Sequence, residues 1–237
     1  YDRGAKKTTQ ARILSGMRSF FNYLLLNDRI ESLPTEFIDS PKPGRKLPDV
    51  LSVGEIGAIL DAIDLSTPFG HRNRAIIETL YSCGLRVSEL VSLRLAELFF
   101  DDGFLRVIGK GDKQRLVPVS AEAVRLVTLY IEQRRTLPVD AKHADILFLN
   151  NKGRKLSRIM VFYIIRDAVA KAGITKNVSP HTFRHSFATH LLEGGADIRQ
   201  VQELLGHESI LTTEIYTHLD NENLRQNVER HHPLSDW

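Results

Sequence analysis

The residues best suited to chemistry are cations placed beside glycines or at helix starts, together with one tyrosine near the C-terminal end. Arg86 lies two residues after Gly84, where a helix is expected to begin. A guanidinium group and a helix N-terminus both favour a phosphate. Glu89, three residues further on, is placed to pair with Arg86 and hold it in one rotamer. Taken alone, this pair would be an ordinary surface ion pair.

Lys110 lies between Gly109 and Gly111, in the turn between two stretches of β-forming residues. Flanking glycines let the backbone approach another molecule closely. A lysine there can donate a proton if neighbouring cations lower its pKa, although a solvated turn lysine is the commoner case. The glycine–lysine spacing of nucleotide-binding phosphate loops is absent.

His181, Arg184 and His185 share one face of an expected helix that begins after Ser179. The two histidines have the spacing of a zinc pair, but threonine replaces the glutamate of that motif and no third ligand has a matching spacing. We therefore expect no metal here. A histidine and an arginine at the positive end of a helix are better suited to holding a phosphate.

His207 follows Gly206 at an expected helix end, and Tyr216 lies on the next helical segment. A tyrosine hydroxyl has a pKa near 10 and is a poor nucleophile unless cations stabilise its anion. Taken singly, Tyr216 resembles a half-buried packing tyrosine, and the chain has six tyrosines. Its claim to be a nucleophile therefore depends on the other residues of the set.

The ordered set resembles the tyrosine recombinases, and among them the Xer-type site-specific recombinases of bacteria. The family uses Arg, Lys, His-x-x-Arg, His or Trp, and Tyr, in that order. The surrounding sequence is similar as well, in GLRVSELVSL, RVIGKGDKQRLVPV and SPHTFRHSFATHLLEGGADIRQVQELLGHESILTTEIYTH. The resemblance covers about Leu47 to His232 and, more faintly, residues 8–28. The residues that match the catalytic set are Arg86, Lys110, His181, Arg184, His207 and Tyr216.

The resemblance implies a mechanism. Arg86, Arg184 and His181 would hold the non-bridging oxygens of a scissile DNA phosphate and stabilise the charge of the transition state. Tyr216 would attack the phosphorus and become joined to the 3′-phosphate. Lys110 would donate a proton to the departing 5′-oxygen.

The remaining members of the set have supporting roles in this scheme. His207 would hydrogen-bond the phosphate, and Glu89 would position neighbouring side chains. Rejoining would need no ATP, because the phosphotyrosine keeps the bond energy. The resemblance implies no metal and no cofactor, because arginines stabilise the charge. Four further cations are expected to contact DNA: Arg45, Lys46, Lys113 and Arg115.

The elements that must position these residues are mostly helices. Apolar residues recur at helical spacing over residues 8–28. Residues 41–48 hold three prolines and a glycine and predict a linker, either a solvated tether or a basic segment along DNA. Residues 104–108 and 115–119 predict a β-hairpin. Further helices are expected at about 52–63, 74–81, 87–95, 120–135, 157–172, 180–193, 197–205, 209–219 and 220–231.

The predicted fold is therefore mainly α with a small antiparallel β-hairpin or sheet. Helix starts are indicated by the Ser52–Glu55 capping box and by Pro180 at a first helical position. The expected N-caps are Ser120, Ser157 and Ser179. With the resemblance, residues 49–237 are expected to form a tyrosine recombinase catalytic domain. Residues 1–40 are expected to be the C-terminal remnant of a helical, SAM-like core-binding domain. Since Tyr1 is no initiator methionine, we expect a missing upstream segment.

Composition limits the remaining classes of function. Of 237 residues, 42% are hydrophobic, and 32 Lys and Arg stand against 29 Asp and Glu. A net charge of +3 is weak evidence for a polyanionic partner. Cys83 is the only cysteine, so an intrachain disulfide is excluded, which fits a reducing cytosol, and we expect it in the core. We expect no membrane association and a cytoplasmic location, because no apolar run could span a bilayer.

The expected partner is a double-stranded DNA recombination site. The resemblance implies a homo- or hetero-tetramer on two sites, assembled through the C-terminal helix. Leu219, Leu224 and Val228 are expected either to dock on the neighbouring protomer or to pack on their own domain. A second recombinase and an activator protein are further candidate partners. The Xer resemblance implies chromosome dimer resolution at cell division. The alternatives are an integrase of a phage or mobile element, a relaxing topoisomerase and an inactive DNA-binding relative.

Overall fold

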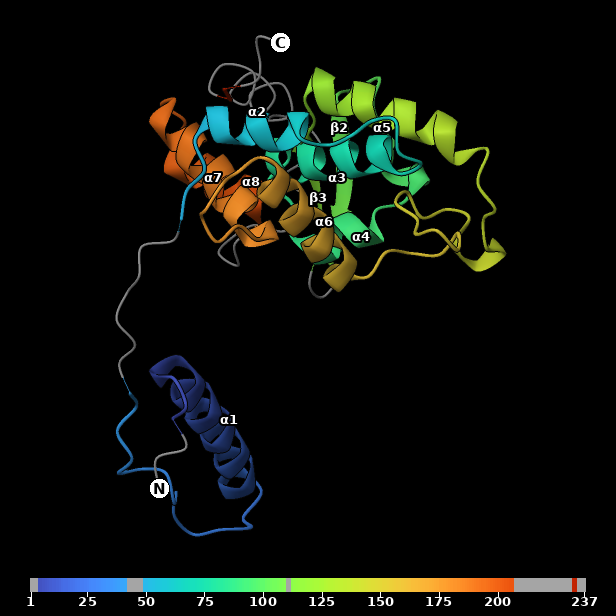
Figure 1. Ribbon diagram of the computed structural model, residues 1–237. Coiled ribbons are helices and arrows are strands. Elements are labelled where there is room, and N and C mark those ends of the chain that lie inside the picture. Colours follow the sequence, from blue (N-terminus) through green and yellow to red (C-terminus); the bar gives the residue numbers. More distant parts are fainter. Residues whose placement is uncertain (1–3, 42–48, 110–111, 207–231, 234–237) are drawn as a thin grey trace. The chain divides into compact units, whose positions relative to one another are not determined.

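The chain divides into two compact units, Tyr1–Leu47 and Pro48–Trp237 (Figure 1). The computed structural model describes residues 4–41, 49–109, 112–206 and 232–233. Each unit is considered by itself. No helix of the described residues is both long and apolar enough to cross a membrane.

The first unit contains the long helix α1 (Lys7–Leu26), which confirms the helix expected at residues 8–28. Leu14 is the only buried residue of α1. Other members of the apolar stripe remain exposed, including Met17 at 44% and Phe20 at 58%. The periodicity therefore predicted the helix correctly, but the described part of this unit covers little of its apolar face.

The second unit is mainly helical, as the sequence predicts. Most of its helices begin and end close to the expected positions, but α3 begins at Gly70 rather than near residue 74. The expected segments 209–219 and 220–231 lie outside the described residues. The helices are α2 (Val53–Asp61), α3 (Gly70–Ser82), α4 (Val87–Ser92), α5 (Ala121–Arg134), α6 (Arg158–Lys171), α7 (Pro180–Glu193) and α8 (Ile198–Leu205), with short 3₁₀ turns at Leu95–Glu97 and Ala141–His143.

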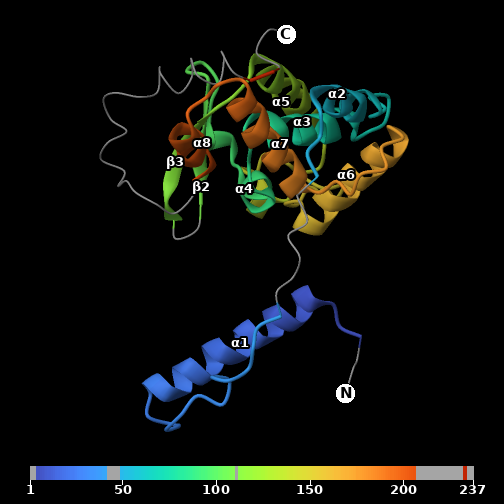
Figure 2. The same cartoon turned by 90° about the vertical axis from the view of Figure 1, so that its left-hand side faces the viewer.

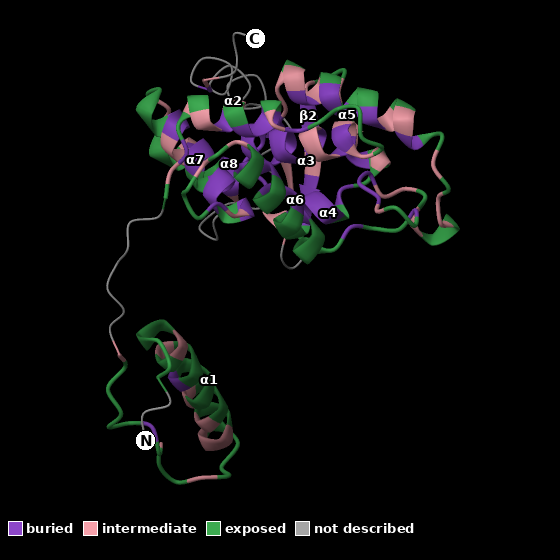
Figure 3. Ribbon diagram, in the orientation of Figure 1, coloured by how far each residue is buried: buried purple, intermediate pink, exposed green. Residues whose placement is uncertain are grey.

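Helix α3 lies at the centre of this unit, with α5 and α7 packed along it (Figures 1 and 2). It also contacts α2, α4 and α6. Ile76, Ile77, Leu80 and Tyr81 are completely buried, and Cys83, just after the helix, is 1% exposed. Buried residues line the sides on which these helices face one another (Figure 3). Cys83 is thus a core residue, as predicted.

Three short antiparallel strands lie in the order β1 (Leu98–Phe99), β2 (Phe104–Ile108) and β3 (Gln114–Pro118). Strands β2 and β3 form the predicted hairpin, with Leu105 opposite Val117. The two-residue strand β1 was not expected, because it is too short to produce an alternating pattern. Helix α8 packs against β3, which brings the end of that helix to the sheet.

The predicted helix starts are confirmed. Ser52 and Glu55 exchange both bonds of a capping box, with donor–acceptor distances of 2.7 and 3.2 Å. Ser120 and Ser157 each accept a backbone N–H at 3.1 Å, and Pro180 opens α7. One helix ends earlier than predicted.

Helix α4 stops at Ser92, although the apolar pattern runs to Leu95. The backbone there bonds to another segment of the chain: Leu95 N–H donates to the carbonyl of Asp145 at 2.8 Å, and Leu147 N–H donates to the carbonyl of Leu93 at 2.8 Å. These pairings replace the next helical turn, and apolar periodicity alone does not reveal them.

His232, near the C-terminal end of the chain, lies in the core of the second unit. The residue is 3% exposed, and the centroid of its ring lies 4.9 Å from that of Tyr81 and 5.6 Å from that of Phe187. Burial, together with the nearby charge of His190, lowers the pKa of His232 to about 4. The imidazole is therefore neutral near pH 7 and packs as an aromatic ring.

Ser186 ties the first residues of the second unit to α7. Leu51 N–H donates to Ser186 Oγ at 2.9 Å, and this hydroxyl donates to the carbonyl of Thr182 at 2.9 Å.

Ser186→Ala leaves the buried Leu51 N–H without an acceptor, so we expect a loss of about 1–3 kcal/mol in the free energy of unfolding. Urea unfolding measures it. Thr128→Ala, at an exposed site on α5, is the control, and an equal loss in both variants would contradict this assignment.

Candidate active site

Arg86 and Glu89 form the pair that their spacing predicts. Arg86 is the N-cap of α4, and its backbone N–H donates to Glu89 Oε2 at 2.8 Å. Its guanidinium Nη1 donates to Glu89 Oε1 at 3.0 Å. The carboxylate side chain is 3% exposed, whereas that of Arg86 is 36% exposed. The pair is therefore no ordinary surface ion pair: a buried carboxylate orients an arginine that still reaches solvent.

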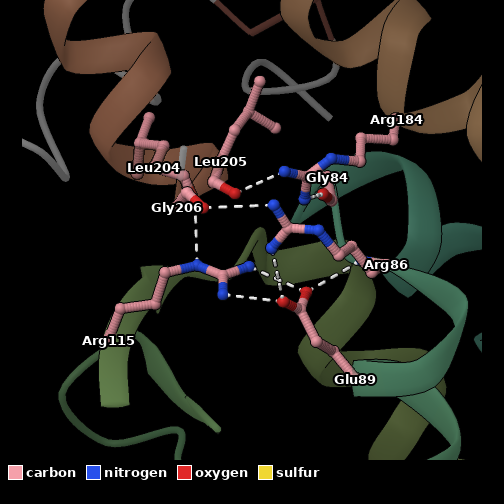
Figure 4. Close-up of polar contacts among 8 residues, drawn as sticks. All are labelled: Gly84, Arg86, Glu89, Arg115, Arg184, Leu204, Leu205 and Gly206. Atoms are coloured by element: carbon pink, nitrogen blue, oxygen red, sulfur yellow. Dashed lines mark hydrogen bonds and ion pairs between the residues drawn. The ribbon is translucent and has the colours of Figure 1, made fainter. Parts of the chain in front are cut away.

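Arg115 of β3 binds the same carboxylate from the other side (Figure 4). Its Nη1 and Nη2 donate to Glu89 Oε1 and Oε2, each at 2.8 Å. Its Nε donates to the carbonyl of Leu204 at 3.0 Å, and the side chain is 10% exposed. Burial raises the pKa of Glu89, but the hydrogen bonds and charge of Arg115, and then Arg86, outweigh it and hold that pKa below its ordinary value. Glu89 is therefore ionised near neutral pH.

Arg184 of α7 is 8% exposed. Its Nη1 donates to the carbonyl of Gly84 at 2.6 Å, and its Nη2 donates to the carbonyl of Leu205. Burial, and then repulsion by Arg86, lowers the pKa of Arg184 to about 10. The guanidinium therefore stays charged at neutral pH in a site where other cations are close.

Gly84 can hold its carbonyl in this position because it has no side chain. Its φ is +56°, and an added Cβ would lie 2.5 Å from Cδ1 of Phe187. Left-handed backbone is open to glycine at little cost. The glycine two residues before Arg86 thus serves the packing of α7 as well as the turn.

All three arginines donate hydrogen bonds to backbone carbonyls at the C-terminal end of α8. Successive carbonyls of Leu204, Leu205 and Gly206 accept from Arg115, Arg184 and Arg86, the last at 3.1 Å (Figure 4). The last carbonyls of a helix have no partner within the helix and carry its partial negative charge. Cations are therefore the partners that this helix end favours.

The structure brings together part of the predicted set. Arg86, Glu89 and Arg184 meet at the end of α8, while His181 and Lys113 are exposed. His181 lies in the first turn of α7, three residues before Arg184. Arg115, expected to contact DNA, lies in the same group, and the remaining predicted site residues lie outside the described residues: Arg45, Lys46, Lys110, His207 and Tyr216.

Sequence reasoning missed the bond between Arg115 and Glu89. The two residues are 26 positions apart, and no spacing rule pairs a strand residue with the first turn of a distant helix. The predicted contact of Arg115 with DNA stays a prediction. The carbonyl acceptors were also missed, although Gly206, which ends α8 in a left-handed conformation, is the one signal that marked this helix end.

The spacing of His181 and His185 matches that of a zinc pair, although the sequence led us to expect no metal there. His181 and His185 are both exposed on α7. Within the part of the chain that the structure describes, no group of three His, Cys, Asp or Glu side chains is arranged to hold a metal ion.

Comparison with known proteins connects this geometry to one family. The sequence profile of the phage integrase family matches residues 49–223. The tyrosine recombinase XerD of Pseudomonas putida is 46% identical over 232 residues, which cover 98% of this chain and 78% of that protein. XerD of Staphylococcus aureus is 44% identical, with coverage of 98% and 79%.

Solved structures agree with this result. The chain resembles the crystal structure of the XerA recombinase with a TM-score of 0.63 at 32% identity, covering 98% of this chain and 78% of that one. It also resembles the XerH site-specific recombinase bound to a palindromic difH substrate after cleavage. That TM-score is 0.75 at 28% identity, with coverage of 95% and 68%.

The buried carboxylate predicts a pH dependence of stability. Glu89→Gln removes the charge that two arginines share, so we expect a loss of about 3 kcal/mol at pH 7, the lower end for a broken buried pair because Arg86 is partly exposed. Since the folded-state pKa of Glu89 is lowered, its contribution is complete above the unfolded-state pKa. It is lost as the pH falls through the folded-state value.

Urea unfolding of wild type and Glu89→Gln from pH 7 to acid pH measures this difference. We expect the gap between the two proteins to shrink at acid pH. Glu122→Gln, which breaks the ion pair of Glu122 with exposed Arg125, is the control and should cost less than about 1 kcal/mol. A gap that stays constant with pH would show that the charge of Glu89 is not the cause.

Proposed function

The chain belongs to the phage integrase family and is a Xer-like tyrosine recombinase, and we propose that the arginine site at the end of α8 binds its scissile phosphate. Enzymes of this kind cleave and rejoin DNA through a 3′-phosphotyrosyl intermediate. The observation that carries the proposal is the convergence of Arg86 and Arg184 on the end of α8. The sequence continues from this end directly into His207 and, nine residues later, Tyr216.

In the proposed reaction, Tyr216 gives up its hydroxyl proton to solvent as its oxygen attacks the phosphorus of the scissile phosphodiester. A tyrosine–phosphorus ester forms on the 3′ side, and the bond to the 5′-oxygen breaks. Lys110 donates a proton to that oxygen as it leaves. Rejoining is the reverse attack by a 5′-hydroxyl, and attack by the 5′-hydroxyl of a partner duplex exchanges strands.

Arg86 and Arg184 stabilise the negative charge that builds on the phosphate oxygens. Both guanidinium groups are aligned by protein acceptors, so no reorganisation is needed when the charge develops. One such donor typically contributes about 3 kcal/mol, or on the order of a hundredfold in rate. His181 and His207 complete the set of donors to the phosphate.

The remaining predicted residues have roles in holding DNA and in supporting the site. Glu89 positions Arg86, which its two bonds to that arginine support. Lys113, exposed beside the hairpin tip, and the linker cations Arg45 and Lys46 are proposed to contact the DNA backbone. Residues 1–40 are proposed to be part of a helical core-binding domain, and residues 49–237 the catalytic domain.

The biological role that we propose is chromosome dimer resolution at cell division, in the cytoplasm, by a tetramer on two recombination sites. The C-terminal helix would join neighbouring protomers, and a second recombinase and an activator protein would complete the assembly. The XerD relatives support this role. They do not favour a mobile-element integrase or an inactive DNA-binding relative.

Tyr216→Phe tests the nucleophile. We expect wild type to form a covalent protein–DNA adduct on a nicked suicide substrate, and Tyr216→Phe to form none, because phenylalanine lacks the attacking oxygen. Denaturing gel electrophoresis of labelled DNA measures the adduct. Tyr163→Phe, which removes a hydroxyl from an exposed tyrosine of α6, is the control and should form adduct at the wild-type rate.

Adduct formation by Tyr216→Phe would show that another residue is the nucleophile. The assay uses the full-length gene product as well as the present chain, because this chain covers 78% of its Pseudomonas putida relative. Absence of adduct from both wild-type forms would contradict the proposed function.

The DNA that is trapped covalently in host cells tests the biological role. We expect sequencing of DNA bound to the recombinase to show one chromosomal site at which dimers are resolved, because site-specific recombinases act at defined sequences. Recovery of attachment sites at the borders of a mobile element would contradict this role. Unselective cleavage along the chromosome would indicate a relaxing topoisomerase.

A further inference from the structure

Arg115 is an arginine of this site to which the family resemblance assigns no catalytic role. Each of its three guanidinium nitrogens donates to the protein: two to Glu89 and one to the carbonyl of Leu204. Its side chain is 10% exposed, against 36% for Arg86. A cation that contacts DNA needs donors directed to solvent, and the guanidinium of Arg115 is directed into the protein (Figure 4).

The bonds of Arg115 connect three elements. Its backbone belongs to β3, its bidentate ion pair reaches Glu89 on α4, and its Nε reaches the last turn of α8. A bidentate pair with a carboxylate fixes both groups in one plane, which a single-point contact does not do. Arg115 thus fixes the position of one element relative to the two others.

Glu89 depends on Arg115 for half of its hydrogen bonds. The carboxylate accepts four: two from Arg86 and two from Arg115. Both of its oxygens are shared between the two arginines. If Arg115 is removed, a buried carboxylate loses its more buried partner, and the bond that orients the guanidinium of Arg86 loses its fixed acceptor.

The end of α8 also packs against the side chain of Arg115. Gly206 has a φ of +60°, and a Cβ added to it would lie 3.2 Å from Nη1 and 3.3 Å from Cδ of Arg115. The arginine therefore packs directly against the residue whose carbonyl accepts from Arg86 at 3.1 Å. Both acceptors that orient Arg86, Glu89 and the Gly206 carbonyl, are held by Arg115.

We propose that Arg115 is a positioning residue for DNA cleavage, which fixes Glu89 and the end of α8 and thereby the guanidinium of Arg86. The role rests on the proposed use of Arg86 against the scissile phosphate. It differs from the contact with DNA that the sequence suggests for Arg115. A DNA contact contributes to affinity, whereas a positioning residue contributes to the rate of cleavage once DNA is bound.

The test compares Arg115→Gln with wild type in single-turnover cleavage of a nicked suicide duplex at saturating protein. We expect the rate of adduct formation to fall by about tenfold to a hundredfold, because the guanidinium of Arg86 loses part of the orientation that stabilisation of the transition state requires. The dissociation constant for the uncleaved duplex should change less than about twofold. Arg125→Gln, which breaks the exposed bidentate ion pair with Glu122, is the matched control and should retain both values.

A double-mutant cycle shows whether Arg115 acts through Glu89. In a Glu89→Gln background, Arg115→Gln should slow cleavage much less than it does in wild type, because the acceptor that it positions is already altered. A general loss of folding would not produce this pattern, and thermal unfolding of each variant is measured in parallel. Effects that multiply independently would overturn the proposal.

Arg115→Lys separates charge from geometry and provides a second variant if Arg115→Gln unfolds. Lysine keeps the charge but cannot place a planar pair of donors on the carboxylate and a third on Leu204. We therefore expect Arg115→Lys also to cleave more slowly than wild type. Cleavage at the wild-type rate by Arg115→Lys, or a loss of DNA affinity without slower cleavage in either variant, would overturn the proposal.

The result also separates this inference from the proposed function. Wild type that forms no adduct would overturn the proposed function and this inference with it. An active wild type beside an equally active Arg115→Gln would overturn the inference alone.

Discussion

The guanidinium groups of Arg86, Arg115 and Arg184 carry the same charge, and the protein holds them close together at the end of α8. Their mutual repulsion is visible in the lowered pKa of Arg184, where the charge of Arg86 adds to the effect of burial. Glu89 offsets this repulsion, because its buried carboxylate accepts from two of the three arginines. The rest of the site depends on this single negative charge.

One carboxylate balances only part of three positive charges, and the end of α8 adds only partial negative charge. Each of its last three carbonyls accepts from a different arginine (Figure 4). Carbonyls at a helix C-terminus carry partial rather than full negative charge. They therefore orient the arginines without cancelling the positive charge that a phosphate requires. The arrangement keeps the site cationic and ordered at once, which is what electrostatic stabilisation of a transition state requires.

The helical core determines where these groups can meet. Gly84, just after the end of the central helix α3, has a left-handed backbone conformation. Phe187 of α7 fills the space that a side chain at Gly84 would need. This close packing places Arg184 against the carbonyl of Gly84 and sets the start of α4 two residues later. A small change in the core would therefore move Arg86 and Arg184 relative to each other.

The sequence by itself determined the helices with clear apolar periodicity and capping, the hairpin, and the pairing of Arg86 with Glu89, because these features depend on residues close together in the chain. The tertiary structure alone decided that Arg115 shares Glu89, that α4 ends at Ser92 and that β1 exists. Those features arise from contacts between distant segments, for which local spacing carries no signal. The order of the family's residues predicted a phosphate site, but the acceptors that hold its arginines are mostly backbone carbonyls. Every residue carries such a carbonyl, so the pattern of side chains marks only the helix end, through Gly206, and not which carbonyl accepts from which arginine.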